Sequence, residues 1–235
     1  MRIGIIGAMT RETEAIVARM TITETQTACG IRYSAGTLDG VDVVTAQCGI
    51  GKVFAALCAA MMIERYHPDL ILNVGVAGAL VEGLDIADIV VADSAVEHDI
   101  DTTPIGDPKG LVSGPNVVHM PVHPTAAERL RKAAVRLGCH TVTAAVATGD
   151  QFIERLEDKR RIARDFRAAA CDMEGGAIAQ VAMTAGVPYA AYRAISDTLL
   201  GNGQEYARNA DRAAAVSARL LSAFLTDLKE EPYEL

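Results

Sequence analysis

Residues 1–12 read MRIGIIGAMTRE, and this stretch carries the pattern that decides the fold. The run Ile3–Ile6 is short, apolar and β-branched, which predicts a buried strand that ends at Gly7. A helical pattern follows over Arg11–Met20. A wholly apolar strand that passes through a glycine turn into a helix is typical of α/β proteins, in which helices cover both faces of a largely parallel sheet.

The same alternation recurs along the rest of the chain. Further strands are predicted at Ile31–Leu38, Val41–Gln47, Leu70–Val74, Ile89–Ala92, Thr141–Ala147 and Tyr189–Ile195, and further helices at Phe54–Tyr66, Pro124–Leu137, Arg155–Phe166 (a charged surface helix), Gly175–Ala185 and Ala207–Leu228. The dipeptide Asp39-Gly40 predicts a hairpin between the first two of these strands, so the sheet is mixed. We expect a three-layer α/β/α sandwich formed by residues 1–235 as a single domain.

The composition excludes several functional classes. A hydrophobic share of 50% with only 22% charged residues rules out a disordered chain. The formal net charge of −8 argues against nucleic acid as a partner and gives no attraction to anionic lipid. The apolar start of the chain turns polar at Thr10, too soon for a signal peptide, and no run approaches the roughly 18 apolar residues of a membrane span. We therefore expect a soluble, cytoplasmic protein with no membrane partner.

Three further features concern cysteines, loops and the tail. The five cysteines are odd in number and lack C-x-x-C spacing, which argues against disulfides or structural zinc and predicts small buried thiols. Residues 99–121 form a long irregular stretch, typical of a lid, a partner-binding segment or disorder. The tail Lys229–Leu235 is expected to fray.

Three carboxylates follow predicted strands, where ligands bind in open α/β sheets. Glu12 and Glu174 each fall at the start of a predicted helix, whose positive dipole end is expected to keep them ionised. Asp197 follows an apolar strand, so burial should raise its pKa, and Ser196 can orient it. A protonated carboxyl of this kind can act as a proton donor at neutral pH.

Each of these features also has a purely structural explanation. The two glutamates can be favourable helix-start residues. The glycine turns at 49–52 and 75–78 can hold an anion on backbone N–H groups, or can be no more than tight strand-to-helix turns. Phe152 can stack on a flat ring or belong to the core. His98 with Asp99 and Asp101 suggests a metal, but a solvated or interfacial cluster is the favoured interpretation, so no metal is expected.

Seven motifs together resemble the bacterial 5′-methylthioadenosine/S-adenosylhomocysteine nucleosidases of the nucleoside phosphorylase superfamily. They are IGIIGAM with Glu12, GIGK at 49–52, NVGVAG at 73–78, HDID at 98–101, TGDQFI at 148–153, DMEGGAIA at 172–179 and RAISD at 193–197. The resemblance runs from residue 1 to about 228. It implies a nucleoside phosphorylase-like domain with a twisted mixed sheet, assembled as a homodimer. It further implies irreversible hydrolysis of the N-glycosidic bond of 5′-thio-substituted adenosines without metal or organic cofactor.

The resemblance also assigns roles to the residues around the bond that breaks. Asp197 matches the general acid that donates to adenine N7, and Ser196 matches the residue that orients it. Glu12 matches the carboxylate that positions and deprotonates the attacking water. Glu174 matches the carboxylate that binds the ribose hydroxyls, with Met173 beside the sugar.

The same comparison assigns the walls of the substrate pocket. The positions it matches are Phe152 (stacking on adenine), Ile153 (backbone groups at the base edge), Arg193 (the wall near the water and Glu12), Met9, Ile50 and Tyr206 (the 5′-substituent), and Ile105, which is expected to reach with the 99–121 loop into the pocket of the partner subunit. The chain departs from the family pattern in three places. Val76 replaces a serine, so water placement would fall more on Glu12 and Arg193, and Asp172 replaces a usual glutamate. The loop TTPIGDPKGLVSGPN carries Thr102 and Ile105 where better-known members have other pocket residues, so the sequence does not rank the 5′-substituents.

Three rival functions remain open from sequence. A purine nucleoside phosphorylase would need a phosphate pocket, which Val76 and the negative charge of Glu12 disfavour. An aminodeoxyfutalosine hydrolase of menaquinone synthesis would share the same carboxylates. A nucleoside-binding sensor without turnover would not need all three acids.

Overall fold

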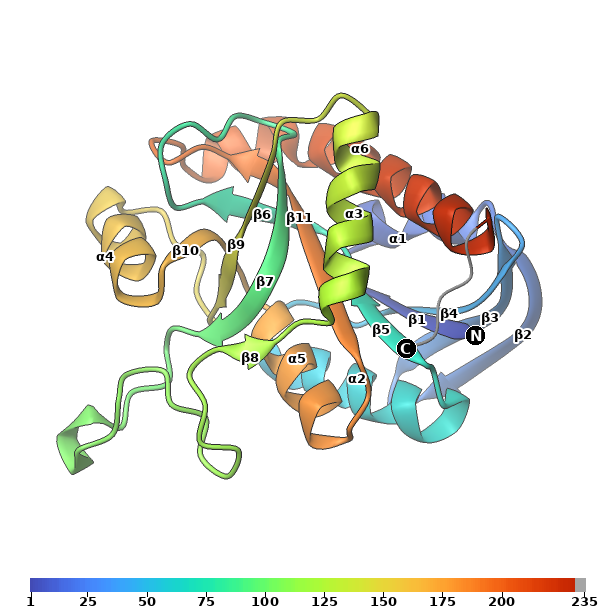
Figure 1. The fold of residues 1–235 in the computed structure, drawn as a ribbon, viewed down its shortest axis with the longest axis horizontal. Helices are drawn as coiled ribbons and strands as arrows, with labels where there is room; N and C mark the ends of the chain where they lie inside the picture. Colours follow the sequence, from blue (N-terminus) through green and yellow to red (C-terminus); the bar gives the residue numbers. More distant parts are fainter. Residues whose placement is uncertain (231–235) are drawn as a thin grey trace.

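The computed structural model describes residues 1–230, and in this part of the chain eleven strands form one sheet (Figure 1). The strands are β1 (Arg2–Gly7), β2 (Thr21–Ala28), β3 (Ile31–Leu38), β4 (Val41–Gln47), β5 (Leu70–Asn73), β6 (Val76–Ala79), β7 (Ile89–Glu97), β8 (Met120–Pro121), β9 (Thr141–Thr148), β10 (Ala168–Asp172) and β11 (Tyr189–Asp197). The helices are α1 (Thr10–Val17), α2 (Lys52–Tyr66), α3 (Pro124–Arg136), α4 (Leu156–Phe166), α5 (Gly175–Thr184) and α6 (Gly203–Glu230), with a 3-10 turn η1 (Thr103–Ile105).

The sheet is mixed, as the predicted hairpin requires. Its strand order is β2-β3-β4-β1-β5-β11-β6-β10-β9-β7-β8, and β11 also pairs with β7. Strand β1 lies parallel between β4 and β5, and β11 lies parallel to β5 and β6. Strand β3 is antiparallel to both β2 and β4, and the pairs β7–β8, β6–β10 and β7–β11 are antiparallel as well. The carboxyl ends of several distant strands therefore reach the same region of the sheet.

Helices cover both faces of this sheet, which confirms the three-layer sandwich. On one face α1, α3 and α6 pack over a cluster that includes Ile3 and Ile5, and on the other α2 and α5 pack over a cluster that includes Ile6. Because successive side chains of a strand point to opposite faces, β1 must be apolar throughout to serve both clusters. This explains why its sequence shows a continuous apolar run and no alternation.

Several elements differ from the sequence prediction, and η1 and β8 lie within the stretch 99–121 that was predicted to be irregular. Strand β2 was not predicted because most of its side chains are exposed and give no apolar alternation. Strand β6 occupies most of the expected glycine turn at 75–78, and the alanine-rich β10 was missed. Helix α6 continues through Lys229 and Glu230, so these two residues do not fray, while the remainder of the predicted tail, 231–235, lies outside the described residues.

Other expectations concern the loop, the cysteines and the membrane. The segment between β7 and β8 projects away from the body of the molecule, and η1 lies within it (Figure 1). All five cysteines are free, three of them are buried, and Cys29 is exposed, contrary to the expectation of uniformly buried thiols. No helix among residues 1–230 has both the length and the apolar character that a membrane crossing needs.

Candidate active site

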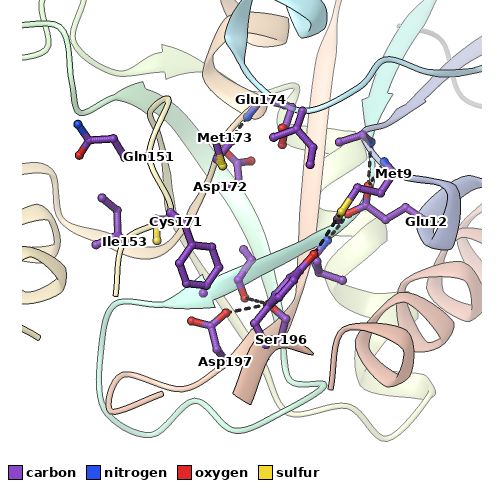
Figure 2. Close-up of a pocket in the computed structure, with 17 residues that line it drawn as sticks. Met9, Glu12, Gln151, Ile153, Cys171, Asp172, Met173, Glu174, Ser196 and Asp197 are labelled. Atoms are coloured by element: carbon purple, nitrogen blue, oxygen red, sulfur yellow. Dashed lines mark hydrogen bonds between the residues drawn. The ribbon is translucent and has the colours of Figure 1, made fainter. Parts of the chain in front are cut away.

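A pocket of about 300 Å³ lies where β1, β9, β10 and β11 end and β6 begins. Twelve of the fourteen residues expected in the site line it: Met9, Glu12, Ile50, Val76, Phe152, Ile153, Asp172, Met173, Glu174, Ser196, Asp197 and Tyr206. Figure 2 shows Glu12, Glu174 and Asp197 on different sides of this pocket. The convergence of the three acids that the sequence predicted is therefore confirmed.

Glu12 is held by backbone donors from two segments. Its Oε2 accepts the N–H groups of Ala8 and Met9 at 2.8 and 2.9 Å, and its Oε1 accepts that of Val76 at 3.0 Å. These bonds favour the charged form, but burial outweighs them and raises the pKa of Glu12 above its ordinary value. Burial therefore opposes the ionised form that the helix start was expected to favour, and the three backbone donors support it.

Two glycines allow the backbone to lie against the acids. A Cβ atom at Gly75 would stand 2.5 Å from Oε1 of Glu12, and one at Gly78 would stand 2.7 Å from Oδ2 of Asp197. Any side chain at either position would displace a carboxylate. The glycines of this segment thus make room for the protein's own acids.

Glu174 precedes the first turn of α5 and accepts the N–H of Gly51 at 2.8 Å through Oε1. Burial, together with the nearby charge of Asp172, raises the pKa of Glu174 to about 8. Burial therefore opposes the anionic form that the helix start was expected to favour, because desolvation exceeds the stabilisation from a helix start. The raised pKa favours the protonated form of this carboxyl, and Oε1 is the oxygen that Gly51 binds.

Asp197 is buried at the end of β11, and burial raises its pKa, as expected. Ser196 Oγ lies 2.9 Å from Oδ1 of Asp197 and 3.1 Å from the carbonyl oxygen of Ala77. The hydroxyl therefore fixes one carboxyl oxygen, in line with its predicted orienting role. The other oxygen, Oδ2, contacts the ammonium of Lys159 at 3.1 Å.

Arg193 does not line the pocket, which corrects its expected place in the site wall. Its guanidinium donates to Asp172 (Nε to Oδ2, 2.9 Å), to the carbonyl groups of Asn73 and Tyr192, and to the Asn73 side chain. All five of its N–H donors are used within the protein, so none remains to hold a water. Arg193 instead anchors Asp172 and lowers the pKa of Glu12 through its charge, against the larger effect of burial.

Asp172 lines the pocket, but its oxygens serve the protein. Oδ1 accepts the hydroxyl of Thr148 at 2.5 Å, and both oxygens lie within 3.3 Å of the Gly175 backbone nitrogen. Together with its bond to Arg193, these contacts place Asp172 as the residue that shapes the turn into α5. Glu174 lies in that turn and lines the pocket.

The aromatic side of the pocket is formed by Phe152 and Tyr206. Their rings meet edge to face with centroids 5.6 Å apart, and Phe152 remains 46% exposed. Phe152 is thus a pocket residue with a free surface and does not belong to the core. The hydroxyl of Tyr206 contacts Sδ of Met9 at 3.2 Å, so these two residues form one continuous wall.

Some predicted features lie away from the pocket, and some pocket residues were not predicted. Ile105 is 80% exposed on η1 and does not line the pocket of its own chain. His98 is buried, while Asp99 binds Lys52, and residues 1–230 hold no group of three or more side chains suited to a metal. The lining residues Ala8, Ala77, Gly78, Gln151 and Cys171 were not among the predicted site residues, although each lies within two positions of one.

Comparison with known proteins gives consistent matches. The chain matches the phosphorylase superfamily over residues 2–226. It is 41% identical over 199 residues to the 5′-methylthioadenosine/S-adenosylhomocysteine nucleosidase of Shewanella oneidensis, and the aligned region covers 84% of each of the two chains. The corresponding nucleosidase from Neisseria meningitidis, solved in complex with methylthio-immucillin-A, has a TM-score of 0.92 at 29% identity and covers 97% of this chain and 99% of that one.

A futalosine hydrolase is also similar in structure. The enzyme from Helicobacter pylori has a TM-score of 0.91 at 28% identity and covers 97% of this chain and 98% of its own. The sequence identity to the Shewanella nucleosidase is higher, at 41%. With matches over most of its length and the three acids in one pocket, this chain belongs to the 5′-methylthioadenosine/S-adenosylhomocysteine nucleosidase family of the phosphorylase superfamily.

Proposed function

We propose that this protein hydrolyses the N-glycosidic bond of 5′-thio-substituted adenosines, releasing adenine and the thioribose product. The observation that carries the proposal is the convergence of Glu12, Glu174 and Asp197 on one pocket with an exposed aromatic ring. Breaking this bond requires protonation of a poor leaving group and stabilisation of a sugar that becomes oxocarbenium-like. Three carboxyl groups in different surroundings can divide these tasks.

Asp197 is the proposed general acid. The bond from C1′ to N9 breaks, its electron pair passes into the purine, and N7 takes the proton of Asp197. Burial raises the pKa of this acid, which favours the protonated form that a general acid needs. Ser196 fixes Oδ1 so that the carboxyl keeps one orientation.

Glu12 is the proposed base for water. The water oxygen bonds to C1′ and passes a proton to the carboxylate, which three backbone N–H groups hold in place. Because the cation forms largely before attack, a strong base is unnecessary. Water placement falls on Glu12 and the surrounding backbone, since Arg193 has no free donor.

The remaining residues bind the substrate. Glu174 is proposed to bind the ribose hydroxyls beside Met173, and Phe152 to stack on adenine, with Ile153 at the base edge. Met9, Ile50 and Tyr206 are proposed to receive the 5′-substituent, since all three line the pocket, are mostly apolar, and Met9 and Tyr206 are in contact.

The assembly and setting follow from the same proposal. We infer a homodimer in which Ile105, exposed on the projecting loop, reaches the partner's pocket. Residues 1–235 would act as one nucleoside phosphorylase-like domain in the cytoplasm, with no metal or cofactor, in salvage of the methylthio group. Analytical ultracentrifugation, with an Ile105→Asp variant beside the parent protein, tests the dimer.

The contacts of Glu12 favour water over phosphate as the nucleophile. A carboxylate already occupies the backbone donors of Ala8, Met9 and Val76. A phosphate beside it would meet repulsion of about 4 kcal/mol for unit charges 4 Å apart at an effective dielectric of about 20. Phosphorolysis is therefore disfavoured.

A panel of 5′-substituted adenosines in phosphate-free buffer, with released adenine as the signal, tests the proposal. We expect release from methylthioadenosine and adenosylhomocysteine, and 5′-deoxyadenosine completes the series. Strict dependence on added phosphate would reveal a phosphorylase, and preference for aminodeoxyfutalosine would reveal the rival hydrolase. Tight binding without turnover would reveal a sensor.

A further inference from the structure

Lys159 is a basic residue whose side chain is completely buried. Its side chain is 0% exposed, although it lies on α4, which sequence reasoning placed at the surface. The ammonium donates to Oδ2 of Asp197 at 3.1 Å and to the carbonyl oxygens of Thr198 and Gly201 at 2.8 and 3.2 Å. An ammonium has three donors, and all three are used.

Burying such a charge costs free energy unless it is fully paired. The pairing here is with the acid at the centre of the proposed reaction, whose side chain is only 2% exposed. The other oxygen of Asp197 is fixed by Ser196, and the backbone of Gly78 lies against the carboxyl. Asp197 is therefore held by α4, by its own strand and by β6 at once.

We propose that Lys159 is a positioning residue for the hydrolysis, which fixes Oδ2 of Asp197 and stabilises the carboxylate that forms when this acid gives its proton to the leaving purine. The inference rests on the proposed role of Asp197. Before transfer Lys159 faces a neutral acid, and afterwards it faces an anion, so its attraction grows as the reaction proceeds. An interaction that is stronger in the transition state raises kcat and leaves KM largely unchanged.

Lys159 also connects the acid to the proposed adenine-binding segment. Phe152 and Ile153 lie just before α4, and Lys159 is in the first half of that helix. The carbonyl groups that Lys159 binds belong to the turn between β11 and α6. Tyr206 lies in the first turn of α6, directly after that turn. One side chain thus sets the spacing between the base-binding segment, the acid and the aromatic wall.

Several groups face Asp197 and influence its titration. Lys159 and Ser196 lower its pKa, Glu205 on α6 raises it, and burial raises it most. Cys171 on β10 and Tyr206 on α6 also interact electrostatically with Asp197. Removal of Lys159 alone should therefore raise the pKa of Asp197, and the alkaline limb of activity, where the acid loses its proton, should move to higher pH.

The experiment measures kcat and KM for methylthioadenosine against pH in four proteins: the parent, Lys159→Met, Lys159→Arg and Arg160→Met. Arg160→Met is the matched control, because this substitution removes a positive charge from the next position along α4, where the side chain is 60% exposed. We expect Lys159→Met to lose about tenfold or more in kcat with little change in KM. Its alkaline limb should move upward, while Lys159→Arg and Arg160→Met keep the parental limb.

An unshifted alkaline limb in folded Lys159→Met would overturn the inference, as would a loss that appears only in KM. If that variant does not fold, Lys159→Gln serves in its place, since an amide keeps donors for the carbonyl groups without the charge. Asp197→Asn separates the two proposals. A parent that releases adenine, an inactive Asp197→Asn and an unshifted Lys159 variant would refute only the role of Lys159. An active Asp197→Asn would refute the role of Asp197 itself.

Discussion

The backbone N–H of Val76 donates to Oε1 of Glu12 at 3.0 Å and joins the start of β6 to the first turn of α1 across 64 residues. The contact uses the amide of residue 76 and not its side chain. The bond therefore does not depend on which side chain stands at position 76. What valine changes is the polarity of the adjoining surface, and Glu12 keeps its orientation.

Glu12→Gln should remove the base and preserve the pocket. The amide is nearly isosteric, but it cannot take a proton from water, so kcat should fall by about 10²–10⁴-fold. Binding of an adenine analogue, measured by calorimetry, should stay within a few-fold of the parent. Retained hydrolysis in this variant would show that another group activates the water.

Gly75→Ala should displace the carboxylate of Glu12 while leaving residue 12 itself unchanged. The new methyl group would stand 2.5 Å from Oε1 of Glu12, so the acid or the strand must move. We expect a loss of kcat approaching that of Glu12→Gln, together with about 1–3 kcal/mol of lost stability. Steady-state kinetics and thermal unfolding measure the two effects.

Gly83→Ala provides the control for that substitution. Gly83 has a positive φ of 83°, but no atom lies within 4 Å of its added Cβ. It should therefore lose some stability through backbone strain and keep full activity. Equal loss of activity in both variants would mean that strain, and not contact with Glu12, explains the effect at Gly75.

The pKa of Glu174 predicts how stability changes with pH. Burial raises this pKa from 4.5 to about 8, so the folded protein holds the proton more tightly than the unfolded chain does. The resulting stability is fully present below the unfolded value and is lost as pH rises through the folded one. Glu174→Gln has no such proton. Its melting temperature should therefore decline less than that of the parent between about pH 5 and pH 8.5. Parallel curves would show that Glu174 titrates normally.

The fold was largely predictable because each main strand is buried on both faces and reads as an apolar run. Strand β1 shows this most clearly, with Ile3 and Ile5 on one face and Ile6 on the other. Strand β2 was not predictable in this way, because its side chains are mostly exposed and its place in the sheet is set by its pairing with β3. Pairing energy of this kind leaves no trace in apolar periodicity.

The site was predictable as a set of residues, but not in its electrostatics. The acids were found because they follow strands, whereas the raised pKa of Glu174 arises from three-dimensional burial that a sequence does not report. Lys159 carried a signal that was overlooked. It shares a helix face with Ile162 and Phe166, three and seven positions later, and both of these are buried. A lysine on an apolar stripe predicts a buried charge and hence a buried partner.

Phe152→Ala should weaken substrate binding more than chemistry. The ring is 46% exposed and held edge to face by Tyr206, so it presents a free face to a flat base. Stacking of a base on an aromatic ring is worth about 1–3 kcal/mol, which corresponds to a rise in KM of roughly 5- to 150-fold. Because stacking is similar in the ground and transition states, kcat should change little. Phe152→Tyr keeps the ring and should keep the parental KM. A fall in kcat at unchanged KM would instead mean that Phe152 acts on the breaking bond, through the orientation of adenine N7 toward Asp197.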